Sequence, residues 1–253
     1  MRHRIGTLAV DVEFSLREPW TVLFGPSGSG KSTILRAIAG VVRPQHGRIV
    51  LRSDGTAQPH AVRALFDSSS KQWAPAHLRR IPFAPQSASL FPHKTVRENV
   101  TCYLGRPGAH AIDEALIAFR IDHVAHKYPA QLSGGEAQRV NLARAAVAAG
   151  PESVLLLDEP FTGLDTALRS DLIRALQSWV ARRNLCVLSV THDVAEAFQL
   201  GAEVIRIADG KVVAQGPVES VLADERLQLL RQLRSSESSI KSLSESSEPF
   251  LSG

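Results

Sequence analysis

The sequence predicts an α/β fold, in which helices cover both faces of a mostly parallel sheet. Three observations support this prediction. Short apolar runs of strand length alternate with helical patterns along the chain. Some of these runs, such as Val154–Leu157, are apolar throughout, which is typical of parallel strands buried on both faces. A block with helical patterns and no strand patterns separates the early strands from the late ones, which indicates a helical unit inserted into the sheet.

Strand patterns dominate the first third of the chain. A glycine-rich turn follows the second strand-like run, and a helical pattern begins directly after that turn. Gly40 follows the helical pattern, as glycine often does at helix ends. The elements expected here are strands at Leu8–Leu16, Thr21–Phe24, Arg48–Leu51 and Ile81–Ala84 and a helix at Lys31–Ala39.

Helices are expected from about residue 96 onward, and apolar strands return after residue 150. Asp209 and Gly210 separate the last two strands and predict a type I′ hairpin, which would give the sheet an antiparallel edge. The expected helices are Asp113–Phe119, Glu136–Ala149 and Ala167–Arg183. The expected strands are Val154–Leu157, Leu185–Val190, Val204–Ile207 and Lys211–Ala214.

The domain organisation expected from these patterns is one domain over residues 1–235. Its core would be formed by residues 1–87 and 150–235, with the helical insertion at residues 88–149. Residues 236–253 are rich in serine and poor in apolar side chains, so they cannot bury enough surface to fold. We therefore expect a disordered tail there.

The composition is that of a soluble globular protein, with 44% hydrophobic and 21% charged residues in a chain of 253. The net charge of +4 suits contact with phosphates or an anionic membrane, but it equally fits an ordinary basic surface. Cys102 and Cys186 lack metal or redox spacing and are expected to be buried thiols in a reducing compartment. No segment approaches the roughly 18 to 20 apolar residues of a membrane span, and no signal peptide is evident. We expect a cytosolic protein that meets a membrane only through a partner.

A phosphate-binding loop is predicted between a strand and a helix, where the motif G-x-x-x-x-G-K-[ST] occurs. The glycines allow successive backbone N–H groups to surround an anion, and the helix N-terminus adds partial positive charge. Lys31 is expected to reach the β- and γ-phosphates, and Ser32 to bind Mg²⁺ through its hydroxyl. The motif consists of Gly25, Pro26, Ser27, Gly28, Ser29, Gly30, Lys31, Ser32 and Thr33.

Two carboxylates follow the apolar run Val154–Leu157. Asp158 ends this run and is expected to hold Mg²⁺ through water. Glu159 lies one residue further, where a carboxylate could orient and polarise the attacking water. A phosphate loop and an acidic strand end are shared by many nucleotide hydrolases, so together they predict a P-loop NTPase fold (RecA-like).

A second anion-binding motif narrows this class. Residues 132–140 read LSGGEAQRV, in which Ser133 and the amides of Gly134 and Gly135 open a helix. This segment closely resembles the signature sequence of ATP-binding cassette (ABC) proteins. The resemblance implies that Ser133 meets the γ-phosphate of ATP held on a second copy of the chain. It argues against a GTPase or a small-molecule kinase.

Three further residues resemble elements of the same family, in the family's order. Gln86 resembles the Q-loop glutamine, which contacts Mg²⁺ or the attacking water. Asp165 resembles the D-loop aspartate, which crosses the dimer. His192, after an apolar strand, resembles the switch histidine that holds the γ-phosphate. The resemblance extends from residue 1 to about residue 225.

The resemblance implies an ATPase that acts as a homodimer with two ATP molecules and Mg²⁺ between the copies. Its partners would be integral membrane permease subunits and, indirectly, a periplasmic or lipid-anchored substrate-binding protein, without nucleic acid. It would be peripheral, at the cytoplasmic face of the inner membrane. One departure concerns adenine: residues 1–6 contain no aromatic residue to stack on the base, so His3 or Arg4 could take that role.

The branch of the family is indicated by short segments. Leu132 follows Gln86 by only 46 residues, a compact insertion that resembles bacterial importers. Segments at residues 65–68, 75–80 and 90–96 resemble the molybdate branch of oxyanion importers most, although sulfate, iron(III) and sugar importers share them. An exporter and a soluble non-transport ABC ATPase are the alternatives. A chromosome-type ATPase would carry long heptad arms or zinc-hook cysteines, and the sequence has neither. No C-terminal regulatory domain is expected.

Leu90, Phe91 and Pro92 are expected to line a groove for the permease. The alternative for Phe91 is a place in the core.

Overall fold

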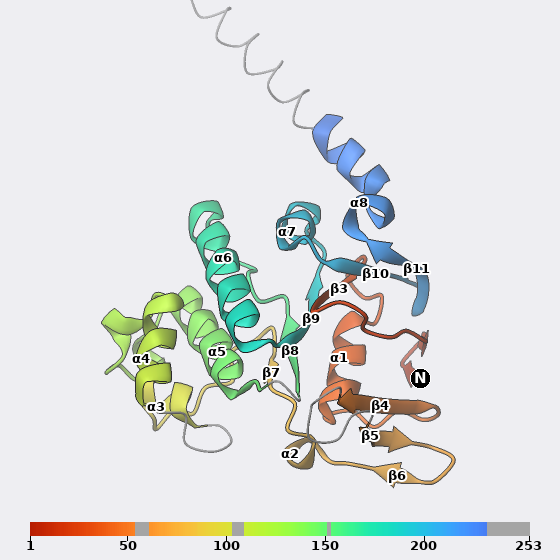
Figure 1. Ribbon diagram of the computed structural model, residues 1–253, viewed down its shortest axis with the longest axis horizontal. Coiled ribbons are helices and arrows are strands. Elements are labelled where there is room, and N and C mark those ends of the chain that lie inside the picture. Colours follow the sequence, from red (N-terminus) through yellow and green to blue (C-terminus); the bar gives the residue numbers. More distant parts are fainter. Residues whose placement is uncertain (54–60, 103–108, 151–152, 232–253) are drawn as a thin grey trace, which may run out of the picture.

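A computed structural model describes residues 1–53, 61–102, 109–150 and 153–231 (Figure 1). Within these residues, the main sheet has six strands in the order β11-β10-β3-β9-β8-β7. Neighbouring strands from β10 to β7 are parallel, whereas β11 pairs with β10 antiparallel. The α/β fold with an antiparallel edge is confirmed. The strands are β3 (Trp20–Phe24), β7 (Phe83–Ala84), β8 (Val154–Asp158), β9 (Cys186–Thr191), β10 (Glu203–Ala208) and β11 (Lys211–Pro217).

The central strands are buried on both faces, as their apolar runs predict. Successive side chains of a strand point to opposite faces, so each strand contributes to two hydrophobic clusters. In β8, for example, Leu155 and Leu157 belong to one cluster and Leu156 to the other. The first cluster lies against the helices between residues 96 and 200, and the second lies against α1 (Lys31–Ala39).

Smaller antiparallel units flank the side of the sheet that carries α1 (Figure 1). The hairpin of β1 (Arg2–Ile5) and β2 (Leu8–Asp11) packs against the start of α1. A second sheet contains β4 (Arg48–Ser53), β5 (Ala61–Asp67) and β6 (Gln72–Trp73), followed by α2 (Ala76–Arg79). Arg79 is completely buried between this sheet and α1, where it donates hydrogen bonds to backbone carbonyl groups of both.

The helical block enters the chain between β7 and β8 and lies to one side of the sheet (Figure 1). Its apolar side chains share one hydrophobic cluster with the sheet, so we propose that it is an insertion in a single domain. The elements are α3 (Val96–Thr101), α4 (Ala109–Ala118), 3₁₀ helices at Asp122–Val124 and Pro129–Gln131, and α5 (Gly134–Ala148). The later helices are α6 (Thr166–Arg183), α7 (Val194–Leu200) and α8 (Val218–Val221), and residues 223–231 are also helical.

Several sequence expectations need correction. The strand expected at Leu8–Leu16 ends at Asp11, and Phe14 and Leu16 pack against the second cluster without strand pairing. The strand expected at Ile81–Ala84 is shortened to its last two residues. β1, β5, β6 and α7 were not expected, because their short or mixed patterns carry weak periodicity.

The predicted type I′ hairpin is confirmed, since Asp209 and Gly210 both have positive φ, at 48° and 73°. The two cysteines are half-buried rather than fully buried. Burial nevertheless raises the pKa of the Cys186 thiol. None of the helices in the described ranges combines the length and the apolar character that crossing a membrane requires. The expected serine-rich tail lies outside the described residues.

Candidate functional site

A pocket of about 480 Å³ lies at the carboxyl ends of the central parallel strands, beside the N-terminus of α1. Ligands of open α/β sheets typically bind at this edge. The pocket brings together most of the residues predicted from the phosphate motif and the strand ends. Its lining residues are Ile5, Leu8, Ser27, Gly28, Gly30, Lys31, Ser32, Thr33, Gln86, Glu159 and His192.

The glycines of the phosphate loop are required by backbone conformation and by close packing. Gly28 and Gly30 have φ of 80° and 99°, which residues with a side chain rarely adopt. A Cβ atom at Gly25 would lie 2.1 Å from the carbonyl oxygen of Ile207, on β10. The loop therefore curls tightly at the end of β3, with its backbone close to the neighbouring strand. Ser29 Oγ is buried in this loop without a hydrogen-bond partner in the described part of the chain.

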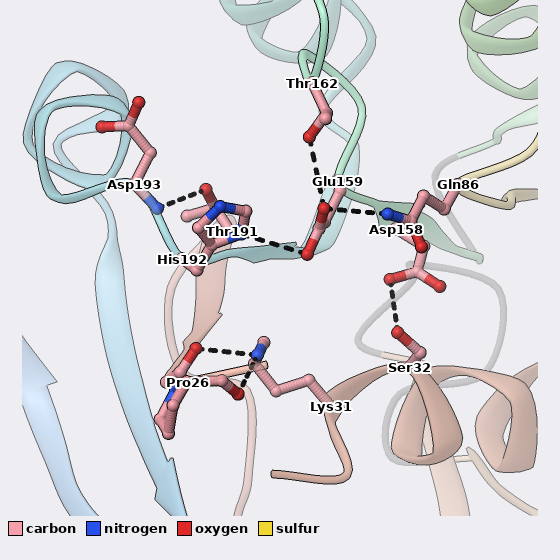
Figure 2. Close-up of polar contacts among 11 residues, drawn as sticks. Pro26, Lys31, Ser32, Gln86, Asp158, Glu159, Thr162, Thr191, His192 and Asp193 are labelled. Atoms are coloured by element: carbon pink, nitrogen blue, oxygen red, sulfur yellow. Dashed lines mark hydrogen bonds and ion pairs between the residues drawn. The ribbon is translucent and has the colours of Figure 1, made fainter. Parts of the chain in front are cut away.

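Lys31 points into the loop in Figure 2. Its Nζ atom donates to the carbonyl oxygens of Gly25 and Pro26 at 2.7 and 2.8 Å. Burial lowers the pKa of this ammonium group, while Glu159 and Asp158 oppose the shift. A buried cation at the N-terminus of a helix is a suitable environment for a phosphate.

Ser32 and Asp158 are joined at the floor of the site (Figure 2). Ser32 Oγ donates to Asp158 Oδ1 at 2.9 Å, and Asp158 is fully buried. Burial raises the pKa of this carboxyl group, and Oδ2 has no hydrogen-bond partner among the described residues. A buried carboxylate with a free oxygen beside a hydroxyl matches the oxygen ligands that Mg²⁺ prefers. The residues present therefore fit a magnesium ion completed by phosphate oxygens.

Glu159 lies at the centre of the polar network in Figure 2. Its Oε2 accepts hydrogen bonds from Gln86 Nε2 at 3.0 Å and Thr162 Oγ1 at 3.3 Å, and its Oε1 lies 3.1 Å from His192 Nδ1. Its φ of 48° is unusual for a residue other than glycine. Strained backbone of this kind is concentrated at functional sites, so the geometry supports a chemical role for this carboxylate.

The structure adds residues to the site that sequence reasoning missed. The hydroxyl of Thr162 contacts Glu159. The sequence signal that could have predicted this contact is that Thr162 follows Glu159 by three residues. At the mouth of the pocket, the side chains expected to meet the base, His3 and Arg4, are not among the lining residues. Instead, Ile5 and Leu8 of the same hairpin line the pocket.

Ser133, Gly134, Gly135 and Asp165 do not line this pocket. Ser133 caps α5: its Oγ accepts from Glu136 N at 3.2 Å, and its own N–H and O–H both donate to the Glu136 carboxylate. Asp165 is exposed and caps α6. A Cβ atom at Gly135 would lie 3.5 Å from Leu164, so the starts of α5 and α6 are neighbours. A single chain thus presents these groups on its surface, away from Lys31.

Comparison with known proteins identifies the family. The family model described as ABC transporter matches residues 10–162, which include the phosphate loop, the signature segment and Glu159. The chain belongs to the ABC transporter family. Its resemblance to ABC proteins in sequence is therefore confirmed.

Curated relatives in this ABC family include proteins named as ATP-binding proteins for the import of molybdenum and of Fe(3+) ions. The chain is 37% identical over 234 residues to the molybdenum import ATP-binding protein ModC of Mesorhizobium japonicum, covering 90% of this chain and 59% of that protein. It is 39% identical over 207 residues to the Fe(3+) ions import ATP-binding protein FbpC of Yersinia pestis, covering 79% of this chain and 55% of that protein. The chain thus spans somewhat more than half the length of these relatives.

The ABC fold is also seen among solved structures. One similar structure is the dimeric post-hydrolysis state of the ATP-binding cassette MJ0796 bound to ADP and Pi. The TM-score is 0.67 and the identity 26%, and the match covers 86% of this chain and 95% of that chain. The predicted fold of a P-loop NTPase is confirmed by this similarity.

Proposed function

We propose that this ABC protein is the ATP-hydrolysing subunit of an importer for molybdate or a related oxyanion, acting through a separate membrane permease. The observation that carries the ATPase role is the grouping of Lys31, Ser32, Glu159 and His192 around one pocket. These residues supply a cation for phosphate, a hydroxyl beside a buried carboxylate, and a general base with an imidazole partner. Together they provide the components that phosphoryl transfer requires.

The proposed reaction is an in-line attack of water on the γ-phosphorus of ATP. The nucleotide's phosphates displace the carbonyl contacts of Lys31, whose ammonium group then pairs with them. Glu159 orients the water and accepts its proton, held by Gln86 and Thr162. His192, beside the same carboxylate, donates to the γ-phosphate as charge spreads over its oxygens. The bond between the γ-phosphorus and the oxygen that bridges it to the β-phosphate breaks, and ADP and inorganic phosphate leave.

Ser32, Gln86 and Asp158 would hold a magnesium ion, whose charge neutralises the phosphate oxygens. The free Oδ2 of Asp158 supports this assignment. The phosphate contacts of the loop would come from the backbone of Gly25 to Gly30 and from Thr33, at the start of α1.

A second copy of the chain would complete each nucleotide site. Ser133 is exposed at the N-terminus of α5, and Asp165 is exposed at the N-terminus of α6, and neither lines the pocket of its own chain. The helix N-terminus at Ser133, Gly134 and Gly135 suits an anion. In the proposed homodimer, these groups meet the γ-phosphate bound by Lys31 of the partner, so closure and hydrolysis are linked.

The permease is proposed to dock near Phe91. This ring is 39% exposed, whereas Leu90 packs against the core. The buried Asn99 side chain fixes the loop: Oδ1 accepts from Phe91 N at 2.8 Å, and Nδ2 donates to the carbonyl oxygens of Phe91 and Lys94. An exposed aromatic side chain on a fixed loop is a suitable anchor for a partner helix. The chain would therefore be peripheral at the cytoplasmic face of the membrane, and a substrate-binding protein would deliver the ion outside.

The choice of molybdate rests on the more extensive of the two reported matches, which covers 90% of this chain. An iron(III) importer is the second candidate, since the FbpC relative is 39% identical over a shorter region. Co-purification of the tagged chain with its permease, followed by uptake assays with molybdate and iron(III), separates the two.

The ATPase role is tested with purified protein and its Lys31→Ala and Ser133→Ala variants. We expect ATP hydrolysis that rises more than linearly with protein concentration, loss of ATP binding in Lys31→Ala, and loss of turnover in Ser133→Ala. Full hydrolysis by an obligate monomer with Ser133 replaced would overturn the proposal.

A further inference from the structure

His192 lies between two residues that are each held in place by the fold. Its side chain is 51% exposed and lies 3.1 Å from Glu159 through Nδ1. On one side, Thr191 ends β9 within the sheet. On the other side, Asp193 caps α7 by accepting a hydrogen bond from Glu196 N at its Oδ1 atom. Whatever fixes Asp193 therefore also fixes where the imidazole can reach.

The second oxygen of Asp193 is bound by a different helix. Arg169 Nη1, on α6, lies 2.6 Å from Asp193 Oδ2. The two side chains are 24% and 32% exposed, so solvent and salt screen this pair less than a fully exposed one. Arg169 N donates to the carbonyl oxygen of Asp165 at 2.9 Å, which places the arginine on the first turn after the α6 cap. The ion pair thus connects the start of α6 to the residue after His192.

We propose that Arg169 is a positioning residue for His192, acting through its ion pair with Asp193. This inference rests on the proposed ATPase function and deepens it. When the pair is intact, the backbone of residues 191–193 is held against α6, and the imidazole is kept beside Glu159 and the expected γ-phosphate. Because Asp165 caps α6, the same pair makes the geometry of one site sensitive to a surface that the proposed dimer covers.

A purely structural role for the pair would be to clamp α6 against α7. The structure already holds these helices together elsewhere, since Gln177 Nε2 donates to the carbonyl oxygens of Gln199 and Leu200, each at 3.2 Å. Loss of the ion pair should therefore act locally, at the start of α7, rather than separate the helices.

The experiment compares Arg169→Gln and Asp193→Asn with the control Arg174→Gln. Asparagine is a good helix cap, so Asp193→Asn keeps the α7 cap while weakening the ion pair. Arg174 pairs with Asp171 on the exposed part of the same helix, which makes it a matched charge removal. We expect kcat to fall about tenfold in either test variant, with the KM for ATP changed less than twofold. Arg174→Gln should keep wild-type turnover, and Arg169→Lys should recover part of it.

Two further measurements test whether Arg169 affects turnover through His192. In a His192→Ala background, adding Arg169→Gln should reduce turnover less than twofold further. In nucleotide-free protein, the ¹³C–¹H ring signal of His192, assigned by its loss in His192→Ala, should shift in Arg169→Gln and Asp193→Asn but not in Arg174→Gln. An unshifted ring signal in Arg169→Gln, or equal losses with and without His192, would overturn the proposal. If wild-type protein lacked ATPase activity, the proposed function would fail, and the ring signal would still decide the role of Arg169.

Discussion

Gln86 and Glu159 are joined by a hydrogen bond of 3.0 Å between Nε2 and Oε2, although 73 residues separate them in the chain. The amide comes from the loop after β7, and the carboxylate comes from the end of β8, the adjacent parallel strand. The loop that leads into the helical block is therefore in direct contact with the proposed general base. This contact, with those of His192 and Thr162, makes Glu159 the centre of the site.

Replacing Glu159 with glutamine tests its role as the general base. The amide keeps the size of the side chain but cannot accept a proton from water, so kcat should fall about 10²- to 10⁴-fold. Nucleotide binding should persist, and the protein should accumulate as an ATP-bound dimer on size-exclusion chromatography. A variant with wild-type turnover would assign the base to another group.

The Glu136 carboxylate should oppose nucleotide-driven dimerisation. It accepts the N–H and O–H of Ser133 at 2.7 and 2.8 Å, which are the groups proposed to meet the partner's γ-phosphate. These hydrogen bonds lower the pKa of Glu136, so it carries negative charge at neutral pH. Glu136→Gln should reduce the ATP concentration needed for dimerisation about fivefold, because one like charge is removed from the helix N-terminus.

The control for that variant is Glu98→Gln, which alters the same position of an equivalent capping box on α3. Both changes should affect helix capping similarly, but only Glu136→Gln should change dimerisation, measured by light scattering across an ATP titration. An equal effect of both variants on dimerisation would show that the change comes from helix stability and not from the charge of Glu136.

Glu196 should make stability depend on pH. Burial, reinforced by Asp193, raises its pKa from 4.5 to about 7. Because the folded chain binds this proton more tightly than the unfolded chain, the free energy of unfolding falls as pH rises from about 4.5 to about 7. The difference corresponds to at most about 3 kcal/mol. Glu196→Gln removes this titration. In urea unfolding, the stability of the variant relative to wild type should therefore be higher at pH 8 than at pH 5. Equal stability differences at both pH values would contradict the raised pKa of Glu196.

Arg79 should be required for stability rather than for chemistry. Its guanidinium donates to the carbonyl oxygens of Ala37 and Ile38 at 2.6 and 2.7 Å and lies 4.5 Å from the centre of the Trp73 ring. Arg79→Met would leave these buried acceptors without donors and should lower the free energy of unfolding by about 3 kcal/mol. Arg48→Met, which removes the exposed partner of an ion pair with Asp67, should cost less than about 1 kcal/mol. Comparable losses in the two variants would refute the role given to Arg79.

The sequence predicted the elements whose patterns are strong and local. The apolar run before Asp158 and the motif at Lys31 placed a strand, a helix and a cluster of charged groups at one sheet edge, and the structure brings these together. β5 and β6 were missed because β5 alternates only partly and β6 has only two residues, and both are held by pairing within the small sheet that also contains β4. The contacts of Arg169 and Thr162 were invisible for a different reason, since a side-chain contact depends on how separate segments pack.

The tight approach of Gly25 to Ile207 has a consequence for the order in which the protein acquires its properties. The first turn of the phosphate loop packs against β10, a strand that is translated about 180 residues after it. A nascent chain that has emerged only as far as α6 already contains Lys31 and Glu159. It still lacks β10, against which the phosphate loop packs. Nucleotide binding should therefore begin late in synthesis, once β10 has left the ribosome, so that a half-made subunit stays inert toward ATP.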